Sequence, residues 1–276
     1  MDHFTQLLSA EDFPAVLRHE GIATGLSGLD RDNGGMQPGK LWVITGTPGV
    51  GKTILALQLA RAAATRAGVS TKVLTARDDI GLVAAWLLAA EAEVLAHHLL
   101  SGKLNARDLS SLESARQRLL QSGLTLWTPQ DSSWQGDNAQ TTPELSVMMR
   151  GGSTPGRVFV IDDVDVLITE SLDAFLPKAR QWARGAGFTL ILTVPHEQLL
   201  VAGQPTPAAR RFVDVLIQIR RESQFVEESP HEGEADLVVL RQRQGPTFKL
   251  PVAFQGMYSR FVDLGYEPRR PPKMVG

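Results

Sequence analysis

Cysteine is absent from the 276 residues of this chain. Disulfides and cysteine-ligated zinc are therefore excluded, which agrees with a reducing compartment. A strong charge of one sign is absent as well, because 28 basic and 30 acidic residues leave a formal net charge of −2. We therefore expect no global positive field that attracts nucleic acid or anionic membranes, although a ring of copies can still concentrate charge in a small pore.

Long hydrophobic runs are also missing. The longest helix-like apolar stretch, LVAAWLLAA at 82–90, ends at Glu91 and is far too short to cross a bilayer. The first residues, MDHFTQLL, contain an acid where a secretion signal has basic residues, and no long apolar segment follows them. We therefore expect a cytoplasmic protein without a membrane partner.

Short apolar runs with the length of buried strands recur along the chain. These expected strands are LWVIT at 41–45, VLTA at 73–76, RVFVI at 157–161 and TLILTV at 189–194. Helical periodicity separates them, and the expected helices cover about 51–67, 80–100, 106–121 and 171–185. This alternation predicts an α/β fold with a mostly parallel, doubly wound sheet. Three later runs, FVDVLIQIR, LVVLRQRQ and FKLPVAF, are expected to join one sheet edge as antiparallel strands.

The remaining segments are an arm, two loops and a tail. Residues 1–20 carry a short amphipathic stretch that Pro14 interrupts, and we expect an arm that packs on this chain or on a neighbour. Residues 128–143 are polar, and residues 222–236 contain six acids and no Lys or Arg, so both are expected to be solvated loops. Residues 267–276 are expected to form a C-terminal tail.

The octapeptide GTPGVGKT at 46–53 matches the pattern G-x-x-x-x-G-K-[ST], with an apolar strand before it and a helix after it. Backbone N–H groups of such a loop, with the positive end of the helix that follows, surround phosphate oxygens. Lys52 would neutralise the β and γ phosphates of ATP, and Thr53 would hold Mg²⁺ through its hydroxyl. The predicted nucleotide-binding residues are Gly46, Thr47, Pro48, Gly49, Val50, Gly51, Lys52 and Thr53.

A second acidic motif follows the expected strand RVFVI. The segment RVFVIDDVDVL at 157–167 places Asp162 at the carboxyl end of that strand, the edge at which ligands bind in open α/β sheets. Magnesium in proteins keeps several of its own waters, so Asp162 is expected to hold Mg²⁺ through water. Together with the glycine-rich loop, this motif predicts a site for ATP and Mg²⁺.

Several stretches resemble one family. The span 21–266 resembles the C-terminal motor domain of the bacterial DnaB-type replicative helicases, a RecA-like P-loop ATPase. The resemblance lies in the lead-in GIATGLSGLDRDNGGMQPGKLWVITGTPGVGKT, in SGKLNARDLSSLESARQRL and most specifically in RQRQGPTFKLPVAFQGMYSRFVDL. It implies a RecA-like ATPase domain over 21–266, with flanking helices and antiparallel strands at the C-terminal edge of its sheet.

The resemblance also implies partners. The R-Q-R at 241–243 matches the basic pair that such motors insert into a neighbour's nucleotide site, so Arg243 is expected to act in trans with Arg241 assisting. Two outward-facing residues on an exposed strand are the alternative. A homo-oligomer, expected as a hexameric ring, follows from the resemblance, with single-stranded DNA and replication or loader proteins as further partners. Residues 1–20 resemble the linker helix by which such motors hold an adjacent subunit.

Two positions depart from the family pattern. Arg77 stands where these motors have the glutamate that orients the attacking water, and Val194 stands where they have a polar residue that senses the γ-phosphate. Three interpretations are open: Asp78 takes the carboxylate role, Asp163 takes it, or hydrolysis is largely lost and Arg77 contacts phosphate. An aspartate must approach the water more closely than a glutamate, and Asp163 starts near the metal, so we favour Asp163. His196 is a candidate phosphate sensor.

Two loops are candidates for gripping DNA. The loop 163–173 holds four acids and no base, whereas 196–211 ends in Arg210 and Arg211, the candidate DNA-binding residues. The favoured function is a helicase-type ATPase that binds ATP and Mg²⁺ and couples hydrolysis to movement on single-stranded DNA. The alternative is a nucleotide-binding, ring-forming regulatory or assembly module with weak or lost hydrolysis.

Overall fold

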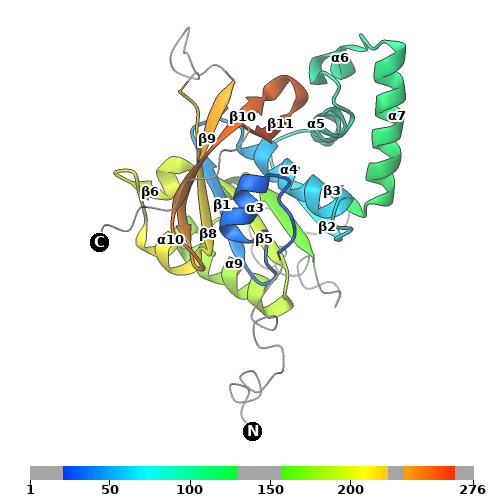
Figure 1. The fold of residues 1–276 in the computed structure, drawn as a ribbon. Helices are drawn as coiled ribbons and strands as arrows, with labels where there is room; N and C mark the ends of the chain where they lie inside the picture. Colours follow the sequence, from blue (N-terminus) through cyan, green and yellow to red (C-terminus); the bar gives the residue numbers. More distant parts are fainter. Residues whose placement is uncertain (1–20, 130–156, 223–232, 265–276) are drawn as a thin grey trace, which may run out of the picture.

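A nine-stranded sheet forms the centre of the molecule, in the order β11-β10-β9-β8-β1-β5-β4-β2-β3 (Figure 1). The computed structural model describes residues 21–129, 157–222 and 233–264. The strands of the sheet are β1 Leu41–Gly46, β2 Thr71–Thr75, β3 Leu124–Trp127, β4 Val158–Asp162, β5 Thr189–Pro195, β8 Val215–Arg220, β9 Glu234–Gln242, β10 Phe248–Gln255 and β11 Arg260–Asp263.

Most of the sheet is parallel. β1 pairs in parallel with β5 and β8, β4 pairs in parallel with β2 and β5, and β2 pairs in parallel with β3. β9, β10 and β11 extend the sheet beyond β8 in antiparallel order. The predicted mostly parallel sheet with antiparallel strands at its C-terminal edge is confirmed.

The prediction that FVDVLIQIR forms an antiparallel strand is wrong. β8 runs parallel to β1, with Val215 opposite Trp42. After β5 the chain crosses back over the sheet through α10 (Pro207–Phe212), and it therefore enters β8 at the end where β1 also begins. Sequence reasoning also missed β3 and β11, which are short and only partly buried, so they lack the continuous apolar run of a central strand.

Helices cover both faces of the sheet (Figure 1). Their bounds, and those of the short turns and of the separate β6–β7 hairpin, are α3 Ser27–Asn33, α4 Lys52–Thr65, α5 Ile80–Ala92, α6 Ala96–Ser101, α7 Ala106–Gln121, η1 Val164–Val166, α9 Leu172–Ala186, η2 His196–Gln198, β6 Leu200–Val201, β7 Gln204–Pro205, α10 Pro207–Phe212 and η4 Gly256–Tyr258. The four expected helices correspond to α4, α5 with α6, α7 and α9.

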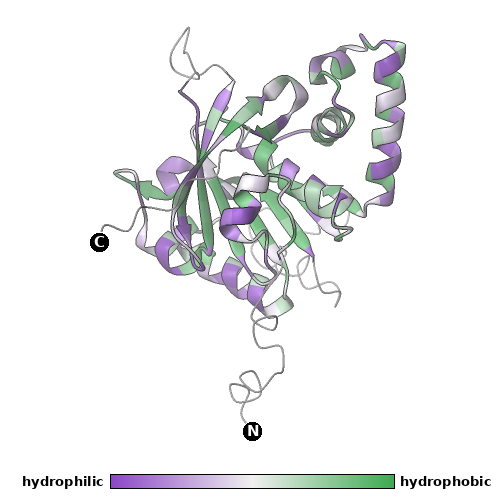
Figure 2. Ribbon diagram, viewed as in Figure 1, coloured by the Kyte–Doolittle hydropathy of each residue, from purple (hydrophilic) through white to green (hydrophobic). Residues whose placement is uncertain are grey.

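Two apolar layers sandwich the sheet, and the central strands are mostly hydrophobic (Figure 2). Successive residues of β1 alternate between them: Trp42 and Ile44 pack in the layer beneath α4, whereas Leu41 and Val43 pack in the layer beneath α9. A strand buried on both faces reads as a continuous apolar run, which explains why LWVIT was recognisable from sequence.

The expected helix over 80–100 is divided. α5 stops where Glu93 adopts a left-handed conformation with φ of 55°, and α6 follows as a separate short helix. Near the end of α5, Glu91 forms ion pairs with Arg61 of α4 and with Arg118 of α7. This carboxylate therefore ties the two outer helices to the helix that follows the glycine-rich loop.

Some expectations fall outside the described residues. These are the arm at 1–20, the tail at 267–276, most of the polar segment 128–143 and most of the acidic segment 222–236. The last residues of that acidic segment belong to β9, where Asp236 forms an ion pair with Lys249. None of the helices in 21–129, 157–222 and 233–264 has the length and apolarity needed to span a membrane.

Candidate nucleotide-binding site

The glycine-rich loop connects β1 to α4 and needs glycine at particular positions. Gly46 has φ of 152°, and a Cβ there would lie 2.8 Å from the carbonyl oxygen of Ile219. Gly51 has φ of 106°, and a Cβ there would lie 2.9 Å from the ring of Phe261. Gly49 is also left-handed, with φ of 74°. The close approach of β8 and β11 to the loop therefore excludes larger residues at two of the predicted nucleotide-binding positions.

The loop has the features of an anion site. The 14-residue helix α4 begins at Lys52, and its N-cap Gly51 supplies no side-chain hydrogen bond to the first turn. The backbone N–H groups of that turn and the positive end of the helix are suited to phosphate oxygens. Lys52 folds back over the loop, where its Nζ donates to the carbonyls of Gly46 at 3.2 Å and Thr47 at 3.3 Å. Pro48 and Val50 complete the loop, and the Val50 side chain is buried.

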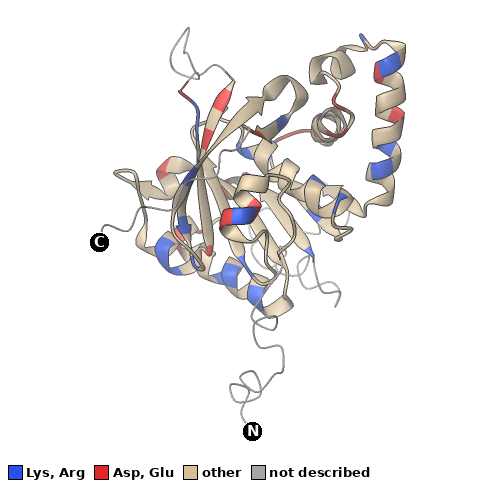
Figure 3. Ribbon diagram, in the orientation of Figure 1, with Lys and Arg blue, Asp and Glu red and all other residues tan. Residues whose placement is uncertain are grey.

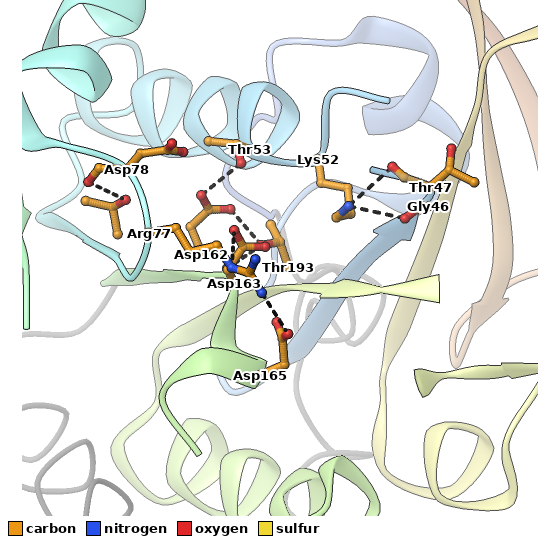
Figure 4. A network of polar contacts seen from close by, with 11 residues as sticks. Gly46, Thr47, Lys52, Thr53, Arg77, Asp78, Asp162, Asp163, Asp165 and Thr193 are labelled. Atoms are coloured by element: carbon orange, nitrogen blue, oxygen red, sulfur yellow. Dashed lines mark hydrogen bonds and ion pairs between the residues drawn. The ribbon is translucent and has the colours of Figure 1, made fainter. Parts of the chain in front are cut away.

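A chain of hydrogen bonds links α4 to the ends of β4 and β5 (Figure 4). The Thr53 hydroxyl donates to Oδ2 of Asp162 at 2.8 Å, and the Thr193 hydroxyl donates to Oδ1 at 2.6 Å. The Thr193 oxygen also accepts the backbone N–H of Asp163 at 2.7 Å. The two residues predicted to hold Mg²⁺, Thr53 and Asp162, are thus in direct contact although they are far apart in sequence.

Burial dominates the electrostatics of this carboxylate. It raises the pKa of Asp162 to about 6; the hydroxyls of Thr193 and Thr53 oppose the shift, and the negative charge of Asp163 adds to it. A neighbouring cation favours the ionised form of a buried carboxylate. Oxygen ligands are those that Mg²⁺ prefers, so the pair of Thr53 and Asp162 fits this ion.

Arg77 crosses from the β2–α5 connection to the acids that follow β4 (Figure 4). Its Nε lies 3.4 Å from Oδ2 of Asp163, and its Nη2 lies 3.3 Å from Oδ2 of Asp165. Asp163 has a left-handed backbone with φ of 53°. Burial raises the pKa of Asp163, Arg77 opposes that shift, and the charges of Asp165 and Asp78 add to it.

Asp78, the other candidate base, lies on the same side of the site. Its charge contributes to raising the pKa of both Asp162 and Asp163. Its backbone carbonyl accepts a hydrogen bond from Thr75. Both candidate carboxylates therefore gather at the carboxyl ends of β2 and β4, but only Asp163 is paired with Arg77.

The end of β5 contributes a residue that sequence reasoning missed. Val194 is fully buried, and its carbonyl accepts a hydrogen bond from Thr45 at 3.2 Å. The adjacent Thr193 points instead at Asp162. The Thr193 hydroxyl near the end of the largely apolar run TLILTV was the available signal. The side chain of His196, the candidate sensor, faces its neighbour Glu197, with Nδ1 2.8 Å from Oε2.

The predicted trans arginines lie at the opposite end of the sheet from the glycine-rich loop. Arg243 pairs with Asp214 at 2.9 Å, and Asp214 accepts the N–H of Leu41, the first residue of β1. Leu41 and Gly46 are separated by roughly 17 Å of extended strand. The Nε of Arg241 donates to the carbonyl of Val213 at 2.7 Å. Neither arginine, held in this way, is directed toward the phosphate loop of its own chain.

Arg210 and Arg211 are helical residues, and the expectation that they lie at the end of a loop is wrong. The segment 196–211 forms η2, the β6–β7 hairpin and most of α10, and Thr206 caps α10 by accepting the N–H of Ala209. Both arginines are exposed in the last turn of α10. Figure 3 shows Lys and Arg gathered on α9 and α10.

An arginine that belongs to no recognisable sequence motif stacks on an aromatic ring beside the glycine-rich loop. The guanidinium of Arg221 lies 4.0 Å from the ring centroid of Phe254, and its Nη1 donates to the carbonyl of Gly49 at 3.3 Å. Phe254 contacts Phe261, whose backbone N–H donates to Gln58 of α4. The antiparallel strands β10 and β11 thus provide an aromatic wall beside the loop.

Known proteins are similar to this chain in sequence and in fold. Residues 21–136 match the DnaB-like helicase C terminal domain. Over these residues the chain is similar to the C-terminal domain of DnaB-type helicases. It is similar to the replicative DNA helicases DnaB of Leifsonia xyli subsp. xyli, with 28% identity over 260 residues, and of Treponema pallidum, with 26% identity over 259 residues. Each of these matches covers 88% of this chain and 56% of the relative, so the chain spans about half the length of the curated relatives.

Solved structures share the fold of this chain. A DnaB-like replicative helicase, described with its interactions with primase, superposes with a TM-score of 0.80 and 17% identity over 96% of this chain and 67% of the other. A solved ATPase domain superposes with a TM-score of 0.76 and 16% identity over 95% of both chains. The family model ends at 136, whereas Asp162, Arg243 and the aromatic wall lie beyond it and rest on the geometry described above.

Proposed function

We propose that this chain is a helicase-type ATPase that binds ATP with Mg²⁺ and couples hydrolysis to movement on single-stranded DNA. The observation that carries the proposal is the contact between Thr53 at the start of α4 and Asp162 at the end of β4. It unites the phosphate loop and the acidic strand end in one site. The similarity to replicative DNA helicases supports the same activity.

The residues of the chain divide the work of binding. Backbone N–H groups of 46–53 hold the phosphates, and Lys52 moves from the carbonyls of Gly46 and Thr47 to neutralise phosphate charge. Thr53 would hold Mg²⁺, with Asp162 beside it, while Thr193 keeps Asp162 oriented. When bound, Mg²⁺ supplies charge neutralisation and a template for the phosphates.

Asp163 is the proposed base for the attacking water, and Asp78 is the second candidate. The pKa of Asp163 is raised by burial, which suits a proton acceptor near neutral pH. Arg77 forms an ion pair with Asp163, and this ion pair must break before the carboxylate can orient water. Slow hydrolysis, accelerated by a partner, is the expected behaviour.

Arg221 and Phe254 are proposed to bind the adenine ring of ATP. Their stacked side chains lie directly beside the phosphate loop, at the distance at which a guanidinium and an aromatic ring attract each other. A purine ring can replace one of these stacking partners. This role accounts for an arginine whose side chain is only partly exposed beside the loop.

Arg243, assisted by Arg241, is proposed to reach the nucleotide of a second copy. Their position at the far end of the sheet prevents them from serving their own site, but it suits contact across an interface between copies. A homo-oligomer, expected as a hexamer, follows. Arg210 and Arg211 are proposed to contact DNA phosphates, and replication or loader proteins are proposed as further partners.

The test is ATP hydrolysis by the purified chain with and without single-stranded DNA, with Lys52→Ala as the control for contaminating activity. Stimulation by DNA that Lys52→Ala abolishes is the expected result. Nucleotide binding without any stimulation by DNA would contradict the motor function. That outcome would favour the second candidate, a ring-forming regulatory or assembly module with weak hydrolysis, which the Arg77–Asp163 ion pair also favours.

The two candidate bases are separated by Asp163→Asn and Asp78→Asn. We expect Asp163→Asn to lower turnover by orders of magnitude while ATP binding is retained. If only Asp78→Asn lowers turnover, the assignment passes to Asp78, and if neither does, both assignments are wrong.

A further inference from the structure

Asp214 is a buried aspartate that holds Arg243 from two directions. Its side chain is 3% exposed, and its Oδ1 lies 2.9 Å from Nε of Arg243. Its own carbonyl accepts the backbone N–H of Arg243 at 3.1 Å. Asp214 is itself anchored to the first residue of β1, because its Oδ2 accepts the N–H of Leu41 at 3.0 Å and its N–H donates to the carbonyl of Leu41 at 2.9 Å.

The last turn of α10 provides a second support for the same guanidinium. Nη2 of Arg243 donates to the carbonyl of Arg211 at 2.7 Å. Carbonyls in the last turn of a helix have no partner within the helix, and arginine donors satisfy them. Nε and Nη2 form one edge of the planar guanidinium, so the side that carries Nη1 is turned away from these acceptors. The Arg243 side chain remains 37% exposed.

Arg180 of α9 gives Asp214 a further cation. Its Nη2 lies 3.4 Å from Oδ1 of Asp214, and its Nη1 donates to the carbonyl of Arg211 at 3.1 Å. A buried carboxylate that loses its cationic partner strongly destabilises the folded protein. With Arg180 in place, Asp214 stays paired when the guanidinium of Arg243 shifts toward another anion. Asp214 therefore orients Arg243 in the free site, and the guanidinium can still move to another anion because Arg180 continues to pair with Asp214.

We propose that Asp214 is a positioning residue for Arg243, which it orients toward the phosphates of a nucleotide bound by a second copy. The proposal rests on the proposed function, in which Arg243 acts in trans. A guanidinium held in advance on one edge loses less rotational freedom when its other edge meets phosphate. Because Asp214 also joins the start of β1, the same residue places Arg243 relative to the strand that leads to the phosphate loop.

Asp214→Asn tests the role with little change in shape. The Asn oxygen can still accept the Leu41 N–H, but its amide cannot form an ion pair with Arg243. We expect turnover of ATP to fall by about 10- to 100-fold, as for a displaced catalytic group. Affinity for ATP at the phosphate loop of the same chain should stay unchanged. Asp32→Asn, which removes a surface aspartate paired with Arg31, is the matched control and should behave as wild type.

Mixed oligomers distinguish positioning from damage to the fold. Copies with Asp214→Asn keep an intact phosphate loop, whereas copies with Lys52→Ala keep an intact Arg243. In co-expressed mixtures, we expect turnover per Asp214→Asn copy to rise toward the wild-type value, because Lys52→Ala neighbours supply well-placed arginines. Damage to the site of the Asp214→Asn copy itself would not be rescued in this way.

Several outcomes overturn the proposal. Wild-type turnover by Asp214→Asn, while Arg243→Ala is slow, refutes the positioning role and leaves the proposed function standing. Slow turnover that mixing does not restore, or that comes with lost ATP affinity, assigns Asp214 a structural role only. If Arg243→Ala turns over ATP at the wild-type rate, the trans arginine of the proposed function fails and the positioning role fails with it.

Discussion

Replacing Glu91 by alanine should destabilise the protein more than any surface charge change on α7. Glu91 joins α5 to α4 and α7, and its side chain is 10% exposed. Its partner Arg61 is 9% exposed, so the substitution would leave a buried guanidinium without its carboxylate. Breaking a buried pair from one side costs about 3–5 kcal/mol.

The second partner adds little to this figure. Arg118 is 51% exposed, and an ion pair that water reaches contributes about 0–1 kcal/mol. The expected loss is therefore about 3–5 kcal/mol, nearly all of it from Arg61. Such a loss is a large fraction of the ~5–15 kcal/mol by which domains are stable.

Urea denaturation followed by circular dichroism measures the effect. Glu113→Ala is the control, because Glu113 pairs with Arg116 on the exposed face of α7 and its loss should leave the unfolding midpoint unchanged. A free energy of unfolding for Glu91→Ala within about 1 kcal/mol of wild type would refute the reasoning, since that is the value of a surface pair.

The same network predicts a pH dependence. Burial opposes ionisation of Glu91, but hydrogen bonds from Arg118 and Arg61 outweigh it and lower the pKa in the folded state. Because the folded pKa lies below the unfolded one, the stabilisation is present above the unfolded pKa and is lost as pH falls through the folded pKa. The difference in stability between wild type and Glu91→Ala should therefore shrink on acidification.

Three further predictions concern the nucleotide site. Thr193→Val removes the hydroxyl that orients Asp162 and should lower the affinity for Mg²⁺ in the presence of ATP by about 10- to 100-fold. An unchanged Mg²⁺ titration would contradict this. Gly51→Ala should destabilise the protein by about 1–3 kcal/mol, because the backbone is left-handed and the new Cβ meets the Phe261 ring, whereas Gly68→Ala, with open space around it, should cost less in the same urea denaturation assay. Arg221→Ala should lower affinity for ATP by about 2- to 30-fold but leave affinity for inorganic triphosphate unchanged, and an equal loss for both ligands would rule out base stacking.

The fold was largely predictable because its evidence is local. Central strands buried on both faces are continuous apolar runs, and the glycine-rich loop is a short pattern flanked by one strand and one helix. Direction was harder to predict for β8. A strand is parallel to its neighbour when the preceding segment returns to the end of the sheet where that neighbour begins. The turn-rich stretch before α10 gave no sign of this return.

The site was only partly predictable, because its contacts join distant residues. Arg77 and Asp165 are 88 positions apart, and Thr193 and Asp162 are 31 apart. The resemblance marked Arg77 as a departure from the family pattern, but it gave no indication of which acids would pair with this arginine. Thr193 escaped notice since a threonine is ordinary in a strand, and only its register beside β4 turns the hydroxyl toward Asp162.

By itself, the sequence of this chain determined the glycine-rich loop, the α/β class and the acid at the end of β4, since each depends on neighbours within a few residues. The tertiary structure alone decided which side chains meet. Asp214 reaches Leu41 across 173 positions, and Arg221 meets Phe254 at the loop, because strand order and register place them there. Contacts of that kind follow from how the sheet is assembled, which no short stretch of sequence encodes.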